Sequence, residues 1–338
     1  MAAKIHDYPA EFLEMGLRLV KAGKAVEARG LVRNALAARP GDPLLAALAG
    51  RIMRSKVPSF HHGMLRDHAR NMAWRQAIEA LAPGRVVLDI GTGSGLLAMI
   101  AARAGAAHVH ACEMNPMLAQ TAQTIIAANG LADQITIHPV RSDRLDRQRD
   151  LGGGADLIVS EILAHDLLGE GVLPTMDHAH AQLAAPGAVF LPESATIRVA
   201  LADDPLRPEP LATVEGFDLS AFNAHIKAGQ TARTTDPQFT LRSASADLMT
   251  FDFTRPPSAE GRSTVDLTSS GGAVSGVAQW LRVELGGGAT YENAPGSDPD
   301  AHWGVGHYAL PELRETAAGE VVRVGGWHNK DSIAIWAE

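Results

Sequence analysis

The segment from Val86 to Glu113 constrains the fold of this chain more than any other part of the sequence. It opens with the apolar run VVLDI, continues with glycines at every second position in GTGSG, and then reads LLAMIAARA. These patterns predict a buried parallel strand, a glycine turn and a helix. A second strand is predicted over 108–112, directly before Glu113. Such a unit binds a nucleoside, because glycines let the backbone approach the ligand and the acid accepts hydrogen bonds from ribose hydroxyls.

The glycine spacing, with Asp89 before it, differs from the dinucleotide fingerprint. It resembles the first motif of class I methyltransferases, which bind S-adenosylmethionine (SAM). SAM has no pyrophosphate, so no phosphate cradle is needed, and Asp89 can help to hold the ammonium of its amino-acid end. The alternative is a generic glycine turn in another doubly wound protein. The presence of both Asp89 and Glu113 favours SAM binding.

Length, charge and cysteine content narrow the class of protein. A chain of 338 residues predicts two domains, or one domain with an appendage. The net charge of −8 argues against nucleic acid as the main partner and fits a basic substrate better. Cys112 is the single cysteine, which excludes an internal disulfide framework and suits a reducing compartment. No signal-peptide core or membrane-length apolar run occurs, so we expect a cytoplasmic protein with no membrane partner, and we expect no metal site.

Residues 10–54 are predicted to be helical, with a third helix after the turn at 41–43. About three repeats are needed for a solenoid to stand alone, so we expect this segment to pack on the main body or on a second subunit. It serves either to dock a protein or to cap the fold, and the sequence leaves both open. Eight residues match positions of a tetratricopeptide repeat, a pair of antiparallel helices: Phe12, Met15, Gly16, Leu19, Ala28, Val32, Ala35 and Pro40.

Residues 57–82 form an amphipathic stretch that leads into the first strand. The polar residues between 61 and 70 are denser than a linker needs. Taken alone, they are best explained as a solvated helix face. Six apolar residues are candidates for the buried side: Met64, Leu65, Met72, Trp74, Ile78 and Leu81.

The doubly wound pattern continues beyond the nucleoside motif. We predict a helix over 115–129, a strand over 134–139, a polar loop over 141–154 and a fourth strand over 155–160. In open α/β sheets the ligand crevice lies outside the carboxyl ends of the strands. The group that reacts with SAM should therefore be bound just after the fourth strand.

The loop at that position reads SEILAHDLLGEG and carries two carboxylates, Glu161 and Glu170. Paired carboxylates beside a methyl donor suggest recognition of a cation with a fork of N–H donors, and a guanidinium is such a group. The alternative is a pair of solvated loop acids, the commonest fate of a glutamate. The position at the carboxyl edge of the strands favours a functional role.

We predict a helix over 171–183 and a fifth strand over 188–191, after which the hydrophobic pattern of the sequence changes. From Pro192 onward, short alternating runs separated by Gly, Pro and Asp predict an antiparallel β-sandwich or barrel. The predicted domains are a helical segment (1–55), a SAM-binding Rossmann-like domain (56–192) and a β domain (193–338) with an insertion near 204–237.

From about Phe60 to its end the chain resembles protein arginine methyltransferases. Four motifs carry the resemblance: VLDIGTGSG with Glu113, the double-Glu loop, GFDLS at 216–220, and AHWGVGHYAL at 301–310. The segment GEGVLPTMDHAH is most similar to the type III, monomethylating branch, whereas the tetratricopeptide-like start is similar to a symmetric-dimethylating branch. The resemblance implies a class I methyltransferase domain followed by a β-barrel, with methyl transfer from SAM to a guanidinium nitrogen of arginine in a protein or peptide.

The resemblance also implies a role for each site residue, with the polar stretch at 61–70 folding over SAM as a lid. The residues implied to contact SAM are Asp89, Gly91 and Gly93 in its pocket, Glu113 at the ribose, Ser142 and Asp143 at the adenine, and Arg70 at the carboxylate. Substrate contacts and catalysis fall to Glu161 and Glu170 on the guanidinium, Met64, and the His-Trp turn of His302 and Trp303, whose histidine pairs with Asp67. Glu170 or the His302–Asp67 pair takes the proton that leaves.

Two positions depart from the family pattern. Residue 301 is Ala where the His-Trp turn commonly begins with Thr, and the region 200–216 is short for the family's dimerisation arm, on which a homodimer would depend. Two other classes stay open: a class I methyltransferase acting on another nucleophile, such as lysine or a small molecule, and a SAM-binding scaffold that docks proteins. The sequence also leaves open whether the product is mono- or dimethylated, because ångström-scale space decides it.

Overall fold

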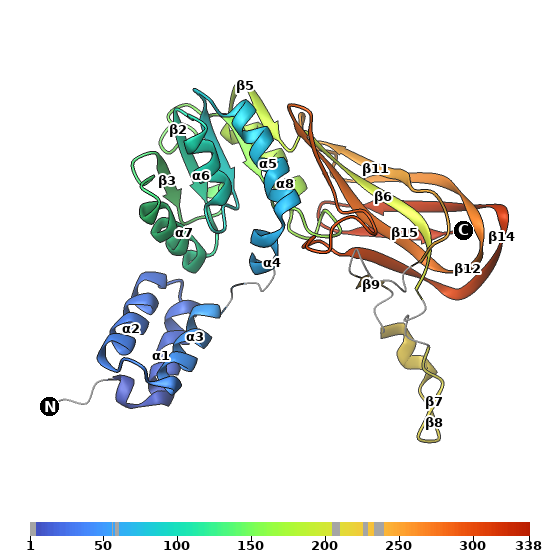
Figure 1. Cartoon of the computed structure of the whole chain (residues 1–338), viewed down its shortest axis with the longest axis horizontal. Helices are drawn as coiled ribbons and strands as arrows, with labels where there is room; N and C mark the ends of the chain where they lie inside the picture. Colours follow the sequence, from blue (N-terminus) through green and yellow to red (C-terminus); the bar gives the residue numbers. More distant parts are fainter. Residues whose placement is uncertain (1–4, 56, 58–60, 205–209, 226–228, 233–239) are drawn as a thin grey trace. The chain divides into compact units, whose positions relative to one another are not determined.

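The computed structural model describes residues 5–55, 57, 61–204, 210–225, 229–232 and 240–338 (Figure 1). The chain divides into two compact units, each made of several stretches. The first unit comprises Met1–His62, Ile78–Glu161 and Gln182–Val189. The second comprises Gly63–Ala77, Ile162–Ala181 and Phe190–Glu338. The predicted limits at 55 and 192 stay predictions. Phe60, where the family resemblance begins, and parts of the insertion near 204–237 lie outside the described residues.

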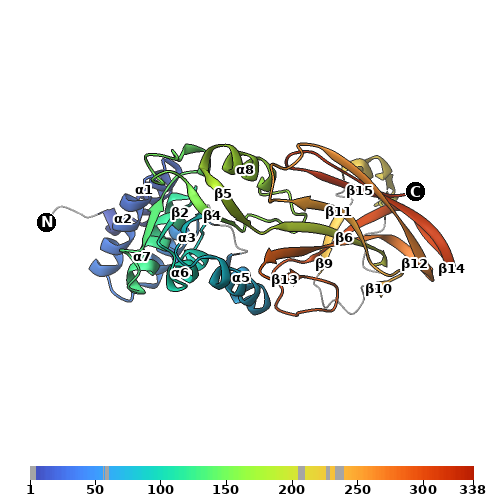
Figure 2. The same ribbon diagram turned by 90° about the horizontal axis from the view of Figure 1, so that it is seen from above.

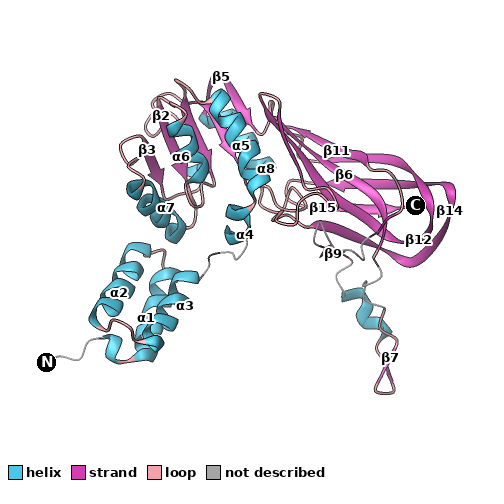
Figure 3. Cartoon of the chain, viewed as in Figure 1, coloured by secondary structure: helices cyan, strands magenta, loops and turns pink. Residues whose placement is uncertain are grey.

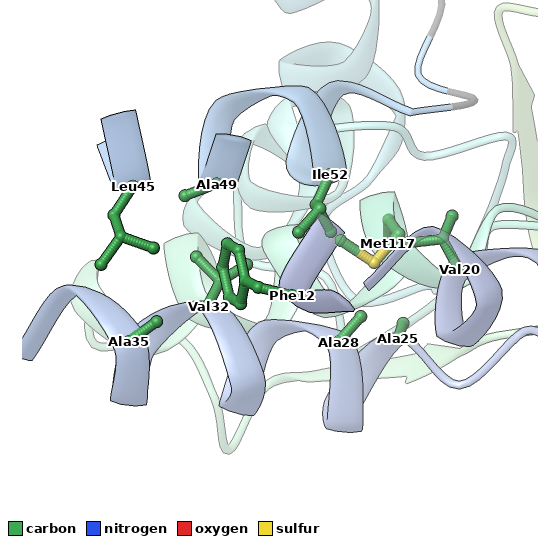
Figure 4. Close-up of a cluster of buried hydrophobic side chains, with 10 residues drawn as sticks. All are labelled: Phe12, Val20, Ala25, Ala28, Val32, Ala35, Leu45, Ala49, Ile52 and Met117. Atoms are coloured by element: carbon green, nitrogen blue, oxygen red, sulfur yellow. The ribbon is translucent and has the colours of Figure 1, made fainter. Parts of the chain in front are cut away.

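Three helices open the first unit, as the sequence predicts: α1 (Pro9–Lys21), α2 (Ala25–Ala38) and α3 (Pro43–Arg54), preceded by the turn η1 (Ile5–Asp7). The Asp42 carboxylate caps α3 by accepting hydrogen bonds from two backbone N–H groups of its first turn, at 3.0 and 3.1 Å. Apolar side chains at helical spacing form one buried cluster (Figure 4), which consists of Phe12, Val20, Ala25, Ala28, Val32, Ala35, Leu45, Ala49, Ile52 and Met117.

Met117 in that cluster does not belong to the three helices but to α7 (Pro116–Ala128), which flanks the sheet of the same unit. A second link is polar, because the Arg29 guanidinium on α2 donates a 2.8 Å hydrogen bond to the Thr121 hydroxyl on α7. The helical segment therefore packs on the main body of the chain, which is one of the two arrangements that the sequence leaves open.

The close packing of α1 on α3 makes a stability prediction. A Cβ added at Gly16 would clash with Cδ1 of Ile52, which is fully buried. We expect Gly16→Ala to lower the free energy of unfolding by about 1–3 kcal/mol, because overpacking outweighs the gain in helix propensity.

The matched control is Gly30→Ala on α2, where an added Cβ meets open space. It should raise stability by up to about 1 kcal/mol, since alanine is the better helix former. Urea unfolding of both variants and the parent protein measures the difference. Equal stability of the two variants would contradict the packing of α1 on α3.

A five-stranded sheet with the order β3-β2-β1-β4-β5 forms the centre of the first unit. Neighbouring strands from β3 to β4 are parallel, as predicted, and the strand order reverses beside β1. Ligands of open α/β sheets bind at such a switch point. The elements are β1 (Val86–Ile90), α6 (Leu96–Arg103), β2 (His108–Cys112), β3 (Ile135–His138), η2 (Ser142–Arg144), β4 (Ala155–Ser160) and β5 (Ala184–Leu191).

Strands make up most of the second unit (Figure 3), and they form an eight-stranded sheet. The long strands β12 and β14 pair antiparallel and run side by side (Figure 2). The predicted fold class is confirmed: a Rossmann-like domain, an antiparallel β domain and N-terminal helices. The strands of this sheet are β6 (Ser194–Asp203), β9 (Gly229–Ala232), β10 (Thr240–Leu241), β11 (Ala246–Asp252), β12 (Gly261–Gly286), β13 (Ala289–Glu292), β14 (Val305–His328) and β15 (Ile333–Ala337).

The remaining elements include the predicted insertion. Its described part holds the two-stranded ribbon of β7 (Thr213–Val214) and β8 (Phe217–Asp218), followed by η4 (Ser220–His225). The other helices are α4 (His61–Arg66), α5 (His68–Leu81), α8 (Val172–His178) and the π-helical turn η3 (Ala179–Leu183). Within the described residues, no helix is long and apolar enough to cross a membrane.

The predicted apolar side of 57–82 is partly wrong. Trp74 and Ile78 are buried, but Leu65 is 39% exposed and Met72 is 71% exposed. Two charged residues, Asp67 and Arg70, are buried instead. Hydrophobicity alone predicts that Leu65 and Met72 are buried and that Asp67 and Arg70 are exposed. A charged side chain can nevertheless be buried where hydrogen-bond partners surround it.

Candidate active site

The glycine turn after β1 adopts the geometry that its sequence predicts. The φ angles of Gly91, Gly93 and Gly95 are +77°, +55° and +85°. Residues other than glycine rarely adopt such a backbone conformation. The Gly91 N–H donates to the carbonyl oxygen of Cys112 at 2.9 Å, which ties the turn to β2. The turn therefore presents backbone, without bulky side chains, at the switch point of the sheet.

Two buried carboxylates flank this turn. Glu113 is 7% exposed; its Oε2 accepts from the Gly93 N–H at 3.1 Å and its Oε1 from the Asn115 N–H at 2.7 Å. Burial raises the pKa of Glu113, and the two backbone hydrogen bonds only partly offset this effect. Asp89 is 1% exposed, and its Oδ2 accepts from the Thr92 hydroxyl at 2.6 Å.

These features fit the chemistry of SAM. The ribose hydroxyls of SAM need a hydrogen-bond acceptor, and its ammonium needs an anion. Close contact between SAM and the protein backbone needs a turn with little side-chain bulk. A Cβ built on Gly93 would have its nearest neighbour, the His61 ring, 3.7 Å away. The structure thus brings Asp89, Gly91, Gly93 and Glu113 together at one edge of the sheet.

Ser142 and Asp143 lie in η2, just beyond the carboxyl end of β3. Ser142 is half-buried, whereas Asp143 is exposed and forms an ion pair with Arg141 at 3.4 Å. Both residues lie after the strand that pairs with β2. Their contact with adenine stays a prediction.

His61 is a site residue that the sequence did not single out. Its ring lies near Gly93, and burial lowers the pKa of His61, an effect that the negative charge of Glu161 opposes. The sequence signals for this stretch are the density of polar residues between 61 and 70 and the resemblance, which implies that the stretch folds over SAM.

The double-Glu loop has a defined conformation. Leu167 has a φ of +73° and its N–H donates to the Ala164 carbonyl at 2.8 Å. The Asp166 carboxylate accepts from the Gly169 N–H at 2.9 Å, and the Gln279 amide of β12 donates to the His165 carbonyl at 3.1 Å. These hydrogen bonds fix the conformation of the loop backbone within the second unit.

The two glutamates of this loop differ in their surroundings. Glu161 directly follows β4, belongs to the first unit and is half-buried. Glu170 belongs to the second unit and is exposed. That both grip one guanidinium stays a prediction from the sequence.

Asp67 forms the centre of a buried hydrogen-bond network in the second unit. Its side chain is fully buried, and its Oδ1 accepts from the Arg70 N–H at 2.9 Å. Its Oδ2 accepts from Nδ1 of His302 at 3.0 Å and from the His302 backbone N–H at 3.1 Å. The same oxygen accepts from the Tyr291 hydroxyl at 2.6 Å. The predicted Asp67–His302 contact is therefore present, and Tyr291 is a member that the sequence did not indicate.

The hydrogen bonds decide the charge of Asp67. Burial by itself raises the pKa of this carboxyl, but the donors from His302, Tyr291 and the backbone outweigh burial and hold the pKa below its usual range. Asp67 is thus an anion at neutral pH. A histidine beside an anion donates its Nδ1–H, so the neutral His302 ring presents Nε2 as its acceptor.

Three further predicted site residues belong to the second unit: Trp303, Arg70 and Met64. Trp303 is 5% exposed, with its ring centroid 4.8 Å from that of His302 and 5.6 Å from that of Tyr291. Arg70 is 2% exposed and its guanidinium donates to the Asn71 side chain at 2.8 Å. Met64 is half-buried on α4. The roles of Arg70 and Met64 stay predictions.

Comparisons with known proteins agree with this arrangement. The family model for ribosomal protein L11 methyltransferase (PrmA) matches residues 71–187. A Trypanosoma brucei PRMT1 enzyme–prozyme heterotetrameric complex with AdoHcy superposes with a TM-score of 0.71 at 23% identity, covering 83% of this chain and 96% of that one. This structural likeness shows a common fold.

Curated relatives are similar in sequence as well, among them a plant and a bacterial protein. Protein arginine N-methyltransferase 7 of Oryza sativa subsp. japonica is 33% identical over 259 residues, which cover 69% of this chain but 36% of the rice protein. An arginine N(omega)-methyltransferase of Streptomyces achromogenes subsp. streptozoticus is 39% identical over 302 residues, which cover 87% of this chain and 83% of the relative. Since that match spans most of both chains, the chain belongs to the arginine N-methyltransferases, enzymes that transfer a methyl group from SAM to a guanidinium nitrogen.

Proposed function

We propose that this enzyme methylates arginine side chains of a protein or peptide, and that His302 accepts the proton that the reaction releases. One observation supports the proton step above all: the buried, ionised Asp67 holds Nδ1 of His302 at 3.0 Å and leaves Nε2 as the acceptor of the ring. The rice relative, whose name includes the word protein, supports the substrate class.

The residues proposed to bind SAM combine the turn and the acids at its edge. Bound SAM supplies an electrophilic methyl carbon. Glu113 accepts from ribose hydroxyls and Asp89 holds the ammonium, while Gly91 and Gly93 let the backbone approach. Ser142 and Asp143 are proposed for adenine, and Arg70 for the carboxylate.

The substrate guanidinium presents the main chemical difficulty. Its pKa lies above about 12, so it arrives protonated and weakly nucleophilic. Glu161 and Glu170 are proposed to bind it through paired N–H···O bonds, which orient one nitrogen for attack and draw positive charge towards the other side. Alignment of this kind contributes several kcal/mol to the rate. Met64 and Trp303 are proposed to shape the space around that nitrogen.

Two candidates can take the proton that leaves the attacking nitrogen. His302 is backed by the Asp67 anion, which stabilises the protonated ring as a carboxylate does in a catalytic triad. Glu170 is exposed, and its proposed role is to bind the guanidinium. We therefore assign the proton to His302.

The oligomeric state and location are proposals as well. The insertion exposes Phe217 (71%) and Phe222 (60%), which fits a surface that a second copy covers in a homodimer. A cytoplasmic location is proposed from the single cysteine, and nucleic acid and membranes are not expected as partners. Monomethylation is the proposed product, in line with the similarity to the type III branch.

Free arginine is a second candidate substrate, because the Streptomyces relative is named for arginine without the word protein. Parallel assays with isotopically labelled SAM, one with an arginine-rich peptide and one with free L-arginine, separate the two. Mass spectrometry should find the methyl group on the peptide. Label on free arginine alone would replace the proposed substrate class, and label on neither would contradict both.

A further inference from the structure

We infer that Tyr291 is a positioning residue of the reaction: its hydroxyl holds Asp67 and sets how strongly Asp67 stabilises the protonated His302 ring. This inference rests on the proposed role of His302 as proton acceptor. We assign Tyr291 no contact with substrate, because it acts through Asp67.

The geometry places Tyr291 firmly in the network. It lies on β13, which pairs with β12 through the Val283–Tyr291 position, and it is 5% exposed. Its hydroxyl lies 2.6 Å from Oδ2 of Asp67, the shortest of the hydrogen bonds that this carboxylate makes with the described residues. Asp67 and Tyr291 thus form a fixed pair within one unit.

One carboxylate oxygen serves three donors: the Tyr291 hydroxyl, the His302 ring and the His302 backbone. Each donor draws negative charge from that oxygen, so the donors compete. The Tyr291 hydroxyl therefore weakens the hold of Asp67 on an imidazolium. It makes His302 release its proton more readily after each turnover.

Tyr291 keeps its proton under assay conditions. Burial, and then the hydrogen bond to the Asp67 anion, raise the pKa of Tyr291 well above its usual range. The other charged groups that face Tyr291 are Arg70 of α5 and Asp298 of the loop after β13, and their effects on this pKa oppose each other. The hydroxyl is thus a donor across the whole range of an activity assay.

The proton step that Tyr291 tunes is balanced. The guanidinium nitrogen forms a bond to the methyl carbon as the bond from that carbon to sulfur breaks, and the bonding pair stays on sulfur. One N–H proton of the attacking nitrogen passes to Nε2 of His302. The two positive charges present before the step are found afterwards on the methylguanidinium and the imidazolium.

The test is the dependence of kcat on pH for the parent enzyme and for the Tyr291→Phe variant. The rate rises with pH as the proton acceptor becomes neutral. Without the hydroxyl, Asp67 holds the protonated ring more strongly, so the acidic limb should move to higher pH by about half to one unit. The KM for SAM should not change. Tyr308→Phe is the control, since it removes the hydroxyl of a half-buried tyrosine of the same unit and should leave the limb in place.

A second measurement avoids any loss of folding in the variant. The chain has three tyrosines, so the Tyr308→Phe protein can be produced with 3-fluorotyrosine at the remaining two, Tyr8 and Tyr291. The more acidic phenol is a stronger donor to Asp67, and the acidic limb should then move to lower pH. The same labelling of the Tyr291→Phe, Tyr308→Phe protein leaves fluorine on Tyr8 alone and is the control for any contribution of Tyr8.

The outcomes separate this inference from the function on which it rests. If His302→Gln leaves kcat and its acidic limb unchanged, the proposed role of His302 fails, and the inference with it. If His302→Gln removes the limb, but neither Tyr291→Phe nor fluorination moves it, His302 keeps its role and the inference about Tyr291 is overturned.

Discussion

Glu161→Gln is expected to lower kcat for methyl transfer by about a hundredfold or more while SAM still binds. The substitution keeps the shape of the side chain but removes the charge that would hold the guanidinium and polarise it. Loss of one preorganised electrostatic contact of this kind typically costs about 10²–10³ in kcat. Steady-state kinetics with an arginine peptide and calorimetric titration with SAM measure the two effects separately.

Asp166→Asn provides a matched control in the same loop. Asp166 accepts a hydrogen bond from the Gly169 N–H at 2.9 Å, and asparagine keeps an oxygen in that position. This variant should keep most of the activity. Near-normal turnover of Glu161→Gln would show that the double-Glu assignment is wrong, and an equal loss in both variants would point to the loop conformation instead of guanidinium binding.

Asp67→Asn is expected to destabilise the second unit and to abolish most methyl transfer. The carboxylate receives four hydrogen bonds from His302, Tyr291 and Arg70, and an amide presents its own N–H donors to some of them. Hydrogen bonds to a buried charge are worth about 1.5–3 kcal/mol each, so we expect a loss of about 2–4 kcal/mol at neutral pH.

The pH dependence of this difference has a definite sign. The folded protein holds the pKa of Asp67 below its ordinary value, so its stabilising effect is fully present above the ordinary pKa and disappears as the pH falls through the lowered one. Urea unfolding at neutral and acidic pH should therefore show a gap between parent and variant that narrows towards low pH.

The surface provides a control for this second prediction. Asp266 pairs with Arg323 at 2.8 Å, but its side chain is 50% exposed. Asp266→Asn should cost far less stability than Asp67→Asn, because exposed ion pairs are weak. Comparable losses for Asp67→Asn and Asp266→Asn would contradict the buried network.

Local sequence patterns predicted the Rossmann-like unit well because its elements are encoded locally. The strand, glycine turn, helix and strand between Val86 and Glu113 follow from hydrophobic runs and the positions of glycine. The hydrogen bond from the Gly93 N–H to Glu113 joins two residues of that same segment. A parallel sheet then places the strand ends at one edge without further information.

Contacts between distant segments were harder to predict. Tyr291 and Asp67 are 224 residues apart, and no motif or periodicity marks Tyr291 as a partner. The burial of Arg70 in place of Met72 depends on partners that only the folded chain supplies. The Arg29–Thr121 bond, which links the N-terminal helices to α7, is a contact of the same long-range kind. The family resemblance supplied the Asp67–His302 pair, which composition and spacing alone would not have indicated.

The most direct test of the central claim is to locate the transferred methyl group. The enzyme is incubated with isotopically labelled SAM and either an arginine-rich peptide or the same peptide with lysine at each arginine position, and the products are fragmented in a mass spectrometer. An arginine methyltransferase should leave label on the guanidinium of the first peptide and none on the second. Label on lysine, or on an atom outside the guanidinium, would contradict this activity.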